Sequence, residues 1–163
     1  MKLRLKILLC LSLLTQALMG CAHRYAPPTS GPTAKLHFIN RTDLVVIYRA
    51  VDNEACERKV RYGTLAVVKG GTSLAPSKET AIVDANKTLV FNVQGNFFGT
   101  RSVTCNMTLN FFPENGKEYE VEFKTKLQSC LVEINKIDYD ATAEKRTTVE
   151  VKKNPNYCVS FGD

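Results

Sequence analysis

The sequence predicts an all-β fold, an antiparallel β-sandwich of about eight strands. Three observations support this prediction. From Ala34 onward, apolar residues recur at every second position, which is the spacing that buries one face of a strand. Turn-forming residues interrupt these runs at intervals of about 8–12 residues, and no helical spacing persists long enough to predict a helix. The 163 residues, 44% hydrophobic and 23% charged, suit one folded domain.

The sequence pattern predicts five short strands in the first half of the domain. Leu36 and Phe38 share one face of the first. The segment 44–48, Leu-Val-Val-Ile-Tyr, is apolar on both faces, which is typical of a strand in the middle of a sheet. The five predicted segments are 36–38, 44–48, 64–68, 80–83 and 87–93. The glycine-rich segment 68–73 is expected to be a flexible connection.

The clearest pattern in the sequence predicts a β-hairpin. Apolar and polar residues alternate from Val103 to Phe111. The segment 113–116, Pro-Glu-Asn-Gly, has the composition of a turn. A return strand is expected over 119–123, with tyrosine, valine and phenylalanine facing the core and glutamates facing solvent.

Two more strands complete the predicted domain. In the segment 130–134, a cysteine, a valine and an isoleucine share one face. In the segment 147–152, Val149 and Val151 are expected to face inward. Both strands extend the predicted sandwich.

The first twenty residues have the pattern of an export signal. Basic residues at positions 2, 4 and 6 precede an apolar run over 7–14, which is too short to span about 30 Å of hydrocarbon. The motif Leu-Met-Gly-Cys follows and ends at Cys21. Residues 1–21 resemble the signal and lipobox of bacterial lipoproteins. The resemblance implies a signal peptide at 1–20, cleavage before Cys21, and palmitate or other acyl chains on that cysteine.

The resemblance also implies where the protein resides. Ala22 rather than aspartate follows the cysteine, which in lipoproteins of two-membraned bacteria favours the outer membrane over the inner. The proline-containing segment 21–33 predicts a flexible tether to a domain at 34–163. Loss of the three basic signal residues reduces the formal charge from +6 to +3, too little to capture nucleic acid. The expected contact through Cys21 is therefore a membrane. An ordinary secretory signal with an accidental cysteine is the alternative.

Four cysteines remain in the expected mature chain, because Cys10 leaves with the signal and Cys21 takes the lipid. They are Cys56, Cys105, Cys130 and Cys158. An even number in an exported domain predicts two disulfides, and the spacing contains no Cys-x-x-Cys pair that would indicate a metal site. If the hairpin keeps Cys105 and Cys130 two strands apart, about 10 Å, then Cys130–Cys158 and Cys56–Cys105 are the expected pairs. If the strands divide between two sheets, Cys105–Cys130 and Cys56–Cys158 replace them.

The sequence contains no recognisable catalytic or cofactor motif, so we expect no enzyme and assign no catalytic residue, cofactor or metal. His37 lies on the opposite face of its strand from Leu36 and Phe38 and is expected to face solvent. Asp138 and Asp140 lack the further oxygen ligands of a calcium loop and are expected to form a turn.

One predicted loop is a candidate for contact with a partner. Phe97 and Phe98 are adjacent, so their rings do not easily point into one core, and Arg101 follows. We therefore expect a membrane-anchored, non-enzymatic binding or accessory protein of the cell envelope, with an envelope protein or a glycan as its partner. The alternative is a secreted or periplasmic inhibitor or immunity-type protein that blocks a lysozyme or a toxin, suggested by the small size, the disulfides and the export signal.

Overall fold

The computed structural model describes residues 24–51, 63–96, 104–126, 129–140 and 143–154. Within these ranges the chain forms ten β-strands and no helix, so the predicted all-β fold is confirmed. Accordingly, this part of the chain has no helix long and apolar enough to cross a membrane. The strands are β1 (Thr33–Asn40), β2 (Val45–Val51), β3 (Gly63–Val68), β4 (Ser77–Asp84), β5 (Leu89–Asn96), β6 (Thr104–Phe111), β7 (Glu118–Lys126), β8 (Ser129–Tyr139), β9 (Glu144–Thr148) and β10 (Lys152–Asn154).

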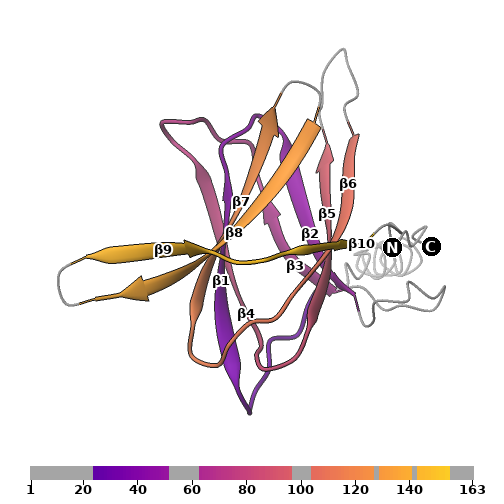
Figure 1. The fold of residues 1–163 in the computed structure, drawn as a ribbon. Helices are drawn as coiled ribbons and strands as arrows, with labels where there is room; N and C mark the ends of the chain where they lie inside the picture. The colour runs from indigo at the N-terminus through magenta and orange to yellow at the C-terminus, as the bar shows by residue number, and fades with distance from the viewer. Residues whose placement is uncertain (1–23, 52–62, 97–103, 127–128, 141–142, 155–163) are drawn as a thin grey trace, which may run out of the picture.

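The ten strands form two five-stranded sheets (Figure 1). One has the order β4-β1-β7-β8-β9 and the other has the order β10-β6-β5-β2-β3. We call them the β7 sheet and the β5 sheet after their central strands. Seven of the eight pairs between these strands are antiparallel, as predicted. The prediction fails at β1 and β7, which pair in parallel.

Both sheets contribute their inward side chains to one hydrophobic core. A chain of aromatic rings runs through it and passes twice from one sheet to the other. Phe38 of β1 lies 4.3 Å from Tyr48 of β2, and Phe111 of β6 lies 5.3 Å from Tyr119 of β7, measured between ring centroids. Phe91 of β5 completes the chain, at 6.4 Å from Tyr48 and 6.3 Å from Phe111. Each such pair contributes about 0.5–1.5 kcal/mol beyond its buried area, so the rings help to fix the two sheets against each other.

The hairpin predicted for β6 and β7 is wrong, although each strand exists and buries the expected face. β6 belongs to the β5 sheet and pairs with β5 and β10, whereas β7 pairs with β1 and β8. The segment 113–116 therefore crosses between the sheets. Its polar groups bind distant loops, because Gly116 N donates to Thr33 O at 2.7 Å and Asn115 N donates to Asn86 Oδ1 at 3.1 Å.

The hairpin of β7 and β8 has the expected register, with Thr125 opposite Cys130. Beyond β8 the strand predicted at 147–152 is divided between the sheets. β9 pairs with β8 in the β7 sheet, and β10 pairs with β6 in the β5 sheet. Val149 and Val151 lie between them, partly buried against the core as expected. The chain thus leaves one sheet and enters the other within three residues.

The segment before β1, expected to be a free tether, is bound to the domain at its first described residues. Arg24 forms a parallel bridge with Thr64 of β3, and Tyr25 N donates to Thr64 O at 3.1 Å. Tyr25 also packs against the core. A Cβ at Gly63 would meet Tyr25 Cα at 2.7 Å, so this close approach requires glycine. The first described residues of the chain are therefore attached to the edge of β3.

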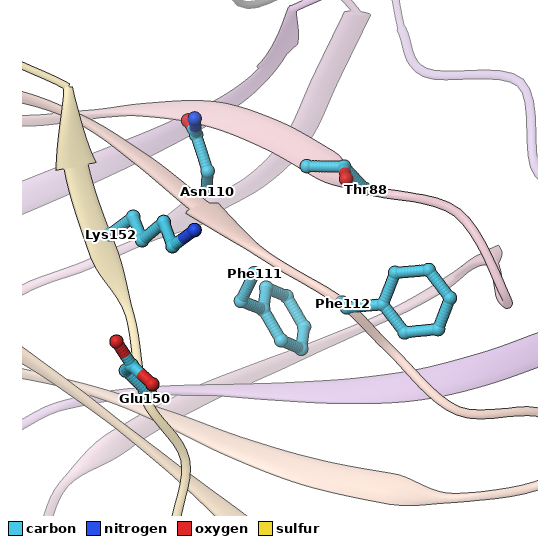
Figure 2. A pocket seen from close by; sticks show the side chains of 6 residues that line it. All are labelled: Thr88, Asn110, Phe111, Phe112, Glu150 and Lys152. Atoms are coloured by element: carbon cyan, nitrogen blue, oxygen red, sulfur yellow. The ribbon is translucent and has the colours of Figure 1, made fainter.

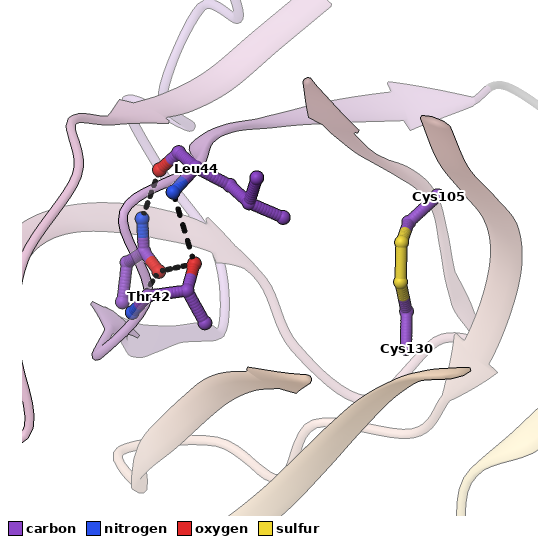
Figure 3. Close-up of a disulfide and its surroundings, with 5 residues drawn as sticks. Thr42, Leu44, Cys105 and Cys130 are labelled. Carbon is purple, nitrogen blue, oxygen red and sulfur yellow. Dashed lines mark hydrogen bonds between the residues drawn. A yellow bond between two sulfur atoms is a disulfide. The ribbon is translucent and has the colours of Figure 1, made fainter. Parts of the chain in front are cut away.

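A disulfide joins Cys105 of β6 to Cys130 of β8, with 6.1 Å between their Cα atoms (Figure 3). The favoured pairing with Cys56 and Cys158 is therefore wrong for these two cysteines, and the two-sheet alternative is correct for them. The estimate of 10 Å assumed that β6 and β7 are neighbours in one sheet. The bond instead links the inward faces of facing sheets. Cys56 and Cys158 lie outside the described residues, so a Cys56–Cys158 bond stays a prediction.

Asn40 organises the crossing from β1 to β2, close to Thr42 and Leu44 (Figure 3). Its side chain is fully buried. The amide nitrogen donates to Leu44 O at 2.6 Å and to Lys69 O at 2.9 Å, and the amide oxygen accepts from Thr42 N at 2.9 Å and Thr42 Oγ1 at 2.7 Å. One side chain thus satisfies polar groups of two loops that would otherwise be buried without partners.

We expect digestion without reductant to return a peptide that links Cys105 to Cys130. Replacing both by serine should lower the free energy of unfolding by about 2–4 kcal/mol, because the bond restricts the unfolded chain. Urea unfolding of the double variant measures this change. A linked peptide that joins Cys105 to Cys56, or Cys130 to Cys158, would contradict the assignment.

Asn40→Ala should lower the free energy of unfolding by more than a surface change does. Each buried polar group left without its hydrogen bond costs about 1–3 kcal/mol. This variant leaves backbone groups of both loops without the bonds that Asn40 makes to them. Thermal unfolding of Asn40→Ala beside Asn106→Ala, a change at an exposed asparagine of β6, measures the difference. Equal stability of the two variants would show that the bonds of Asn40 contribute nothing special.

Candidate functional site

The sequence-predicted site residues divide into those that the structure describes and those that it does not. Cys21, the lipidation candidate, and the partner-contact candidates Phe97, Phe98 and Arg101 lie outside the described residues. His37 faces outward, as expected, and is half-buried between two polar partners. Asp138 belongs to β8 rather than to the expected turn and pairs with Lys117 at 3.2 Å. Asp140 follows that strand.

His37 bridges two strands of the β7 sheet. Its Nε2 lies 2.8 Å from Glu118 Oε2 and its Nδ1 lies 3.2 Å from Thr80 Oγ1. A hydroxyl, an imidazole and a carboxylate in line are the groups of a hydrolytic triad. Here, however, Thr80 and His37 lie on the outward face of a sheet, and Thr80 is exposed. The arrangement links β4, β1 and β7 and thereby strengthens the pairing of these strands.

The outward face of β7 carries three glutamates in a row, each with cationic partners from other parts of the fold. Lys35 and His37 bind Glu118, Arg146 binds Glu120, and Arg41 and Lys124 bind Glu122. Glu120 and Glu122 are buried beneath these partners. The charges of this face, which we call the glutamate row, are therefore largely satisfied within the domain.

These contacts lower the pKa values of two carboxyls of the row, Glu118 and Glu122. Hydrogen bonds from His37 and Lys35 lower the pKa of Glu118. Burial alone would raise the pKa of Glu122, but hydrogen bonds from Lys124 and Arg41 outweigh it, and the pKa is lowered. Both carboxylates are thus held in their charged form.

A groove of about 600 Å³ opens beside the glutamate row, between the β1–β2 and β3–β4 loops. Its two cations are Arg41 and Lys124, and both already bind Glu122. Arg41 also donates to Ser73 O at 3.0 Å. Both cations of this groove are therefore engaged within the domain, and Asp43 is its remaining charged group without an ion pair among the described residues.

A smaller pocket, of about 210 Å³, lies beside the crossing from β9 to β10 (Figure 2). Its position follows from the division of strands, because β10 stays next to β6 while the chain before it leaves toward the other sheet. Six residues line it: Thr88, Asn110, Phe111, Phe112, Glu150 and Lys152. We call it the crossover pocket.

Asn110 gives the crossover pocket an unused acceptor. Its side chain is 9% exposed, and its Oδ1 has no hydrogen-bond partner among the described residues. The hydroxyl of Tyr48 is also buried without a partner, but it lies within the core. Burial without a hydrogen bond costs about 1–3 kcal/mol. The oxygen itself is closed off from solvent as the side chain lies, so it becomes a ligand contact when the amide turns toward the pocket that Asn110 lines, which would also supply the missing hydrogen bond.

Two unpaired charges flank this acceptor. Among the described residues, Glu150 and Lys152 have no ion-pair partner, in contrast to the glutamate row. Lys152 stands opposite Asn110 in the β10–β6 pair, so the two side chains share one face of the sheet. Figure 2 shows Lys152 between Asn110 and Glu150 along one side of the pocket.

Two phenylalanines form the apolar part of the lining. Phe111 belongs to the core and contacts Phe91 and Tyr119. Phe112, the next residue, points the other way and is 53% exposed. The sequence pattern did not lead to the prediction of this site, although it contains one signal. Two adjacent aromatic residues at the end of an alternating strand place one ring outside the core.

No group of three histidine, cysteine, aspartate or glutamate side chains in the described ranges is placed to hold a metal ion. The crossover pocket offers a carboxylate, an ammonium, an amide oxygen, a hydroxyl and an aromatic ring. These groups suit non-covalent recognition of a small polar molecule.

Neither the models of protein families nor the curated proteins that were compared with this chain give a match. Function is therefore inferred from the chemistry of the chain's own residues.

Acidification should destabilise the domain through the glutamate row. A carboxyl whose pKa is lowered by folding contributes stability above its unfolded pKa and loses it as the pH falls through the folded value. We therefore expect the free energy of unfolding to decline as the pH falls below about 4.5. The decline should be shallower in Glu122→Gln than in Glu114→Gln, a control at an exposed carboxyl. Identical slopes in urea unfolding between pH 5 and pH 3 would contradict this account.

Proposed function

We propose that this chain is a lipid-anchored, non-enzymatic binding protein of the bacterial cell envelope, located in the outer membrane. In this proposal residues 1–20 are a signal peptide, Cys21 carries the lipid, and a β-sandwich domain follows. The crossover pocket is its ligand site. The partner is an envelope molecule, a protein or a glycan, that presents a small polar group.

The lipobox-like motif that ends at Cys21 supports the proposed location in the cell envelope. It stands directly after a basic segment and an apolar run, which is the order that export signals share. The Cys105–Cys130 disulfide adds independent support, because such bonds persist in oxidising compartments and are rare in the cytosol.

The unpartnered oxygen of Asn110 is the observation that supports a binding role most directly. It is buried in a residue that lines a pocket together with two unpaired charges, whereas the glutamate row uses its charges within the domain. Polar groups that are costly to leave unpaired are commonly kept where a ligand satisfies them.

The anchor is tested by the intact mass of the protein extracted from bacterial membranes without reductant. We expect the mass of residues 21–163 plus acyl groups, less about four hydrogens for two disulfides. Cys21→Ser should lose the acyl mass and keep the signal peptide. Cys10→Ser, a change inside the expected signal, is the matched control and should leave the mature mass unaltered. An unlipidated mass that begins elsewhere would refute the anchor and favour a secreted inhibitor.

A further inference from the structure

We infer that the crossover pocket binds a single pyranose ring of a glycan. The inference rests on the proposed function, since it names the ligand class of the site proposed there. The charge balance, the hydrogen-bonding groups, the aromatic ring and the size of the pocket support this ligand class.

The opposite charges of Glu150 and Lys152 favour a ligand without net charge. Glu150 contributes one negative charge and Lys152 one positive charge, two positions apart in the chain. An anion would be attracted by one and repelled by the other, and the same holds for a cation. A neutral molecule that bonds to both groups avoids this conflict.

The polar groups of the pocket match hydroxyls. The carboxylate of Glu150 accepts hydrogen bonds, the ammonium of Lys152 donates, and the hydroxyl of Thr88 does both. The buried Oδ1 of Asn110 adds an acceptor once its amide turns toward the pocket. A sugar hydroxyl also donates and accepts, so neighbouring hydroxyls of one ring satisfy both kinds of group. Hydrogen bonds to the charged groups are the stronger ones.

The ring of Phe112 offers an apolar surface beside these groups. It is half-exposed, and Figure 2 shows it on the opposite side of the pocket from Lys152 and Glu150, with the buried Phe111 between them. The face of an aromatic ring carries partial negative charge and attracts the slightly positive hydrogens of other groups. The C–H face of a pyranose presents such hydrogens, and its hydroxyls project from the rim. A small amino acid has balanced charge too, but it lacks an extended apolar face.

The volume limits the ligand to one ring. A space of about 210 Å³ equals roughly seven water molecules at about 30 Å³ each. One pyranose fits this space, and a longer glycan would continue outside the pocket. A ligand of this size with few contacts binds weakly, with a Kd on the order of 1 mM.

The test is saturation-transfer NMR on the full chain as it is recovered from cells, in a detergent without a sugar head group. The probes are free glucose, galactose and N-acetylglucosamine, with glycine and alanine as comparators. We expect at least one sugar to receive saturation and neither amino acid to do so. Titration of that sugar then gives its Kd.

Two variants connect the binding to the pocket. Phe112→Ala removes the exposed ring, and Asn110→Leu removes the unpartnered oxygen without leaving another group unsatisfied. Each should raise the Kd at least tenfold. Tyr139→Ala removes another exposed aromatic ring, from β8, and should leave the Kd within twofold. Thermal unfolding confirms that each variant is folded before it is titrated.

The inference is overturned if no sugar receives saturation, if only the amino acids do, or if Phe112→Ala and Asn110→Leu bind the sugar as tightly as Tyr139→Ala does. These outcomes are separate from the mass measurement. A chain that lacks lipid but binds sugar would refute the anchor and keep the pocket, and a lipidated chain that binds none would do the reverse.

Discussion

Two sheets share one core, and the chain therefore crosses between them repeatedly: five times along the described strands. At each crossing the backbone leaves a ladder of hydrogen bonds, and its polar groups need other partners. Asn40 supplies them at the first crossing, and Thr33 accepts from Gly116 at the fourth. The crossover pocket lies beside the fifth, where one buried acceptor has no partner in the described chain. The same constraint thus produces both the stabilising networks and the candidate site.

The two faces of the domain use charge differently. On the β7 sheet, three glutamates at alternate positions would repel one another, yet each binds cations from different segments of the chain. Such contacts disfavour a shifted register, because a slip by one residue would bury the charges and expose the core face. At the crossover pocket, Glu150 and Lys152 contribute nothing comparable to the pairing of strands. Other described charges, such as Asp43, Lys69, Lys78 and Glu79, also have no ion pair within the described ranges. Glu150 and Lys152 differ from them in that both line one pocket with an aromatic ring.

Local pattern predicted which side chains form the core but not which strands are neighbours. The residues expected to face inward at 104–111 and 119–123 are buried, because their alternation depends on strand geometry alone. The opposite faces are not fully wet as predicted, since Thr108, Asn110, Glu120 and Glu122 are buried as well. Strands of one sheet and of facing sheets bury their faces alike, so the pattern could not distinguish a hairpin from a crossing. The pocket was hidden for a related reason. Val149 and Val151 continue the alternation straight through the point where the chain changes sheets, and only the folded structure brings Lys152 opposite Asn110.

The attachment of Tyr25 to β3 has a consequence for how the domain would sit on a membrane. Four positions separate Cys21 from Tyr25, which reach at most about 14 Å when fully extended. The prolines at 27, 28 and 32 come after this attachment. They therefore link two parts of the domain and do not lengthen the linker between Cys21 and Tyr25. With lipid on Cys21, the edge at Gly63 and Thr64 would stay next to the headgroups. The domain would then stand in a restricted orientation, close to the bilayer, instead of swinging freely above it.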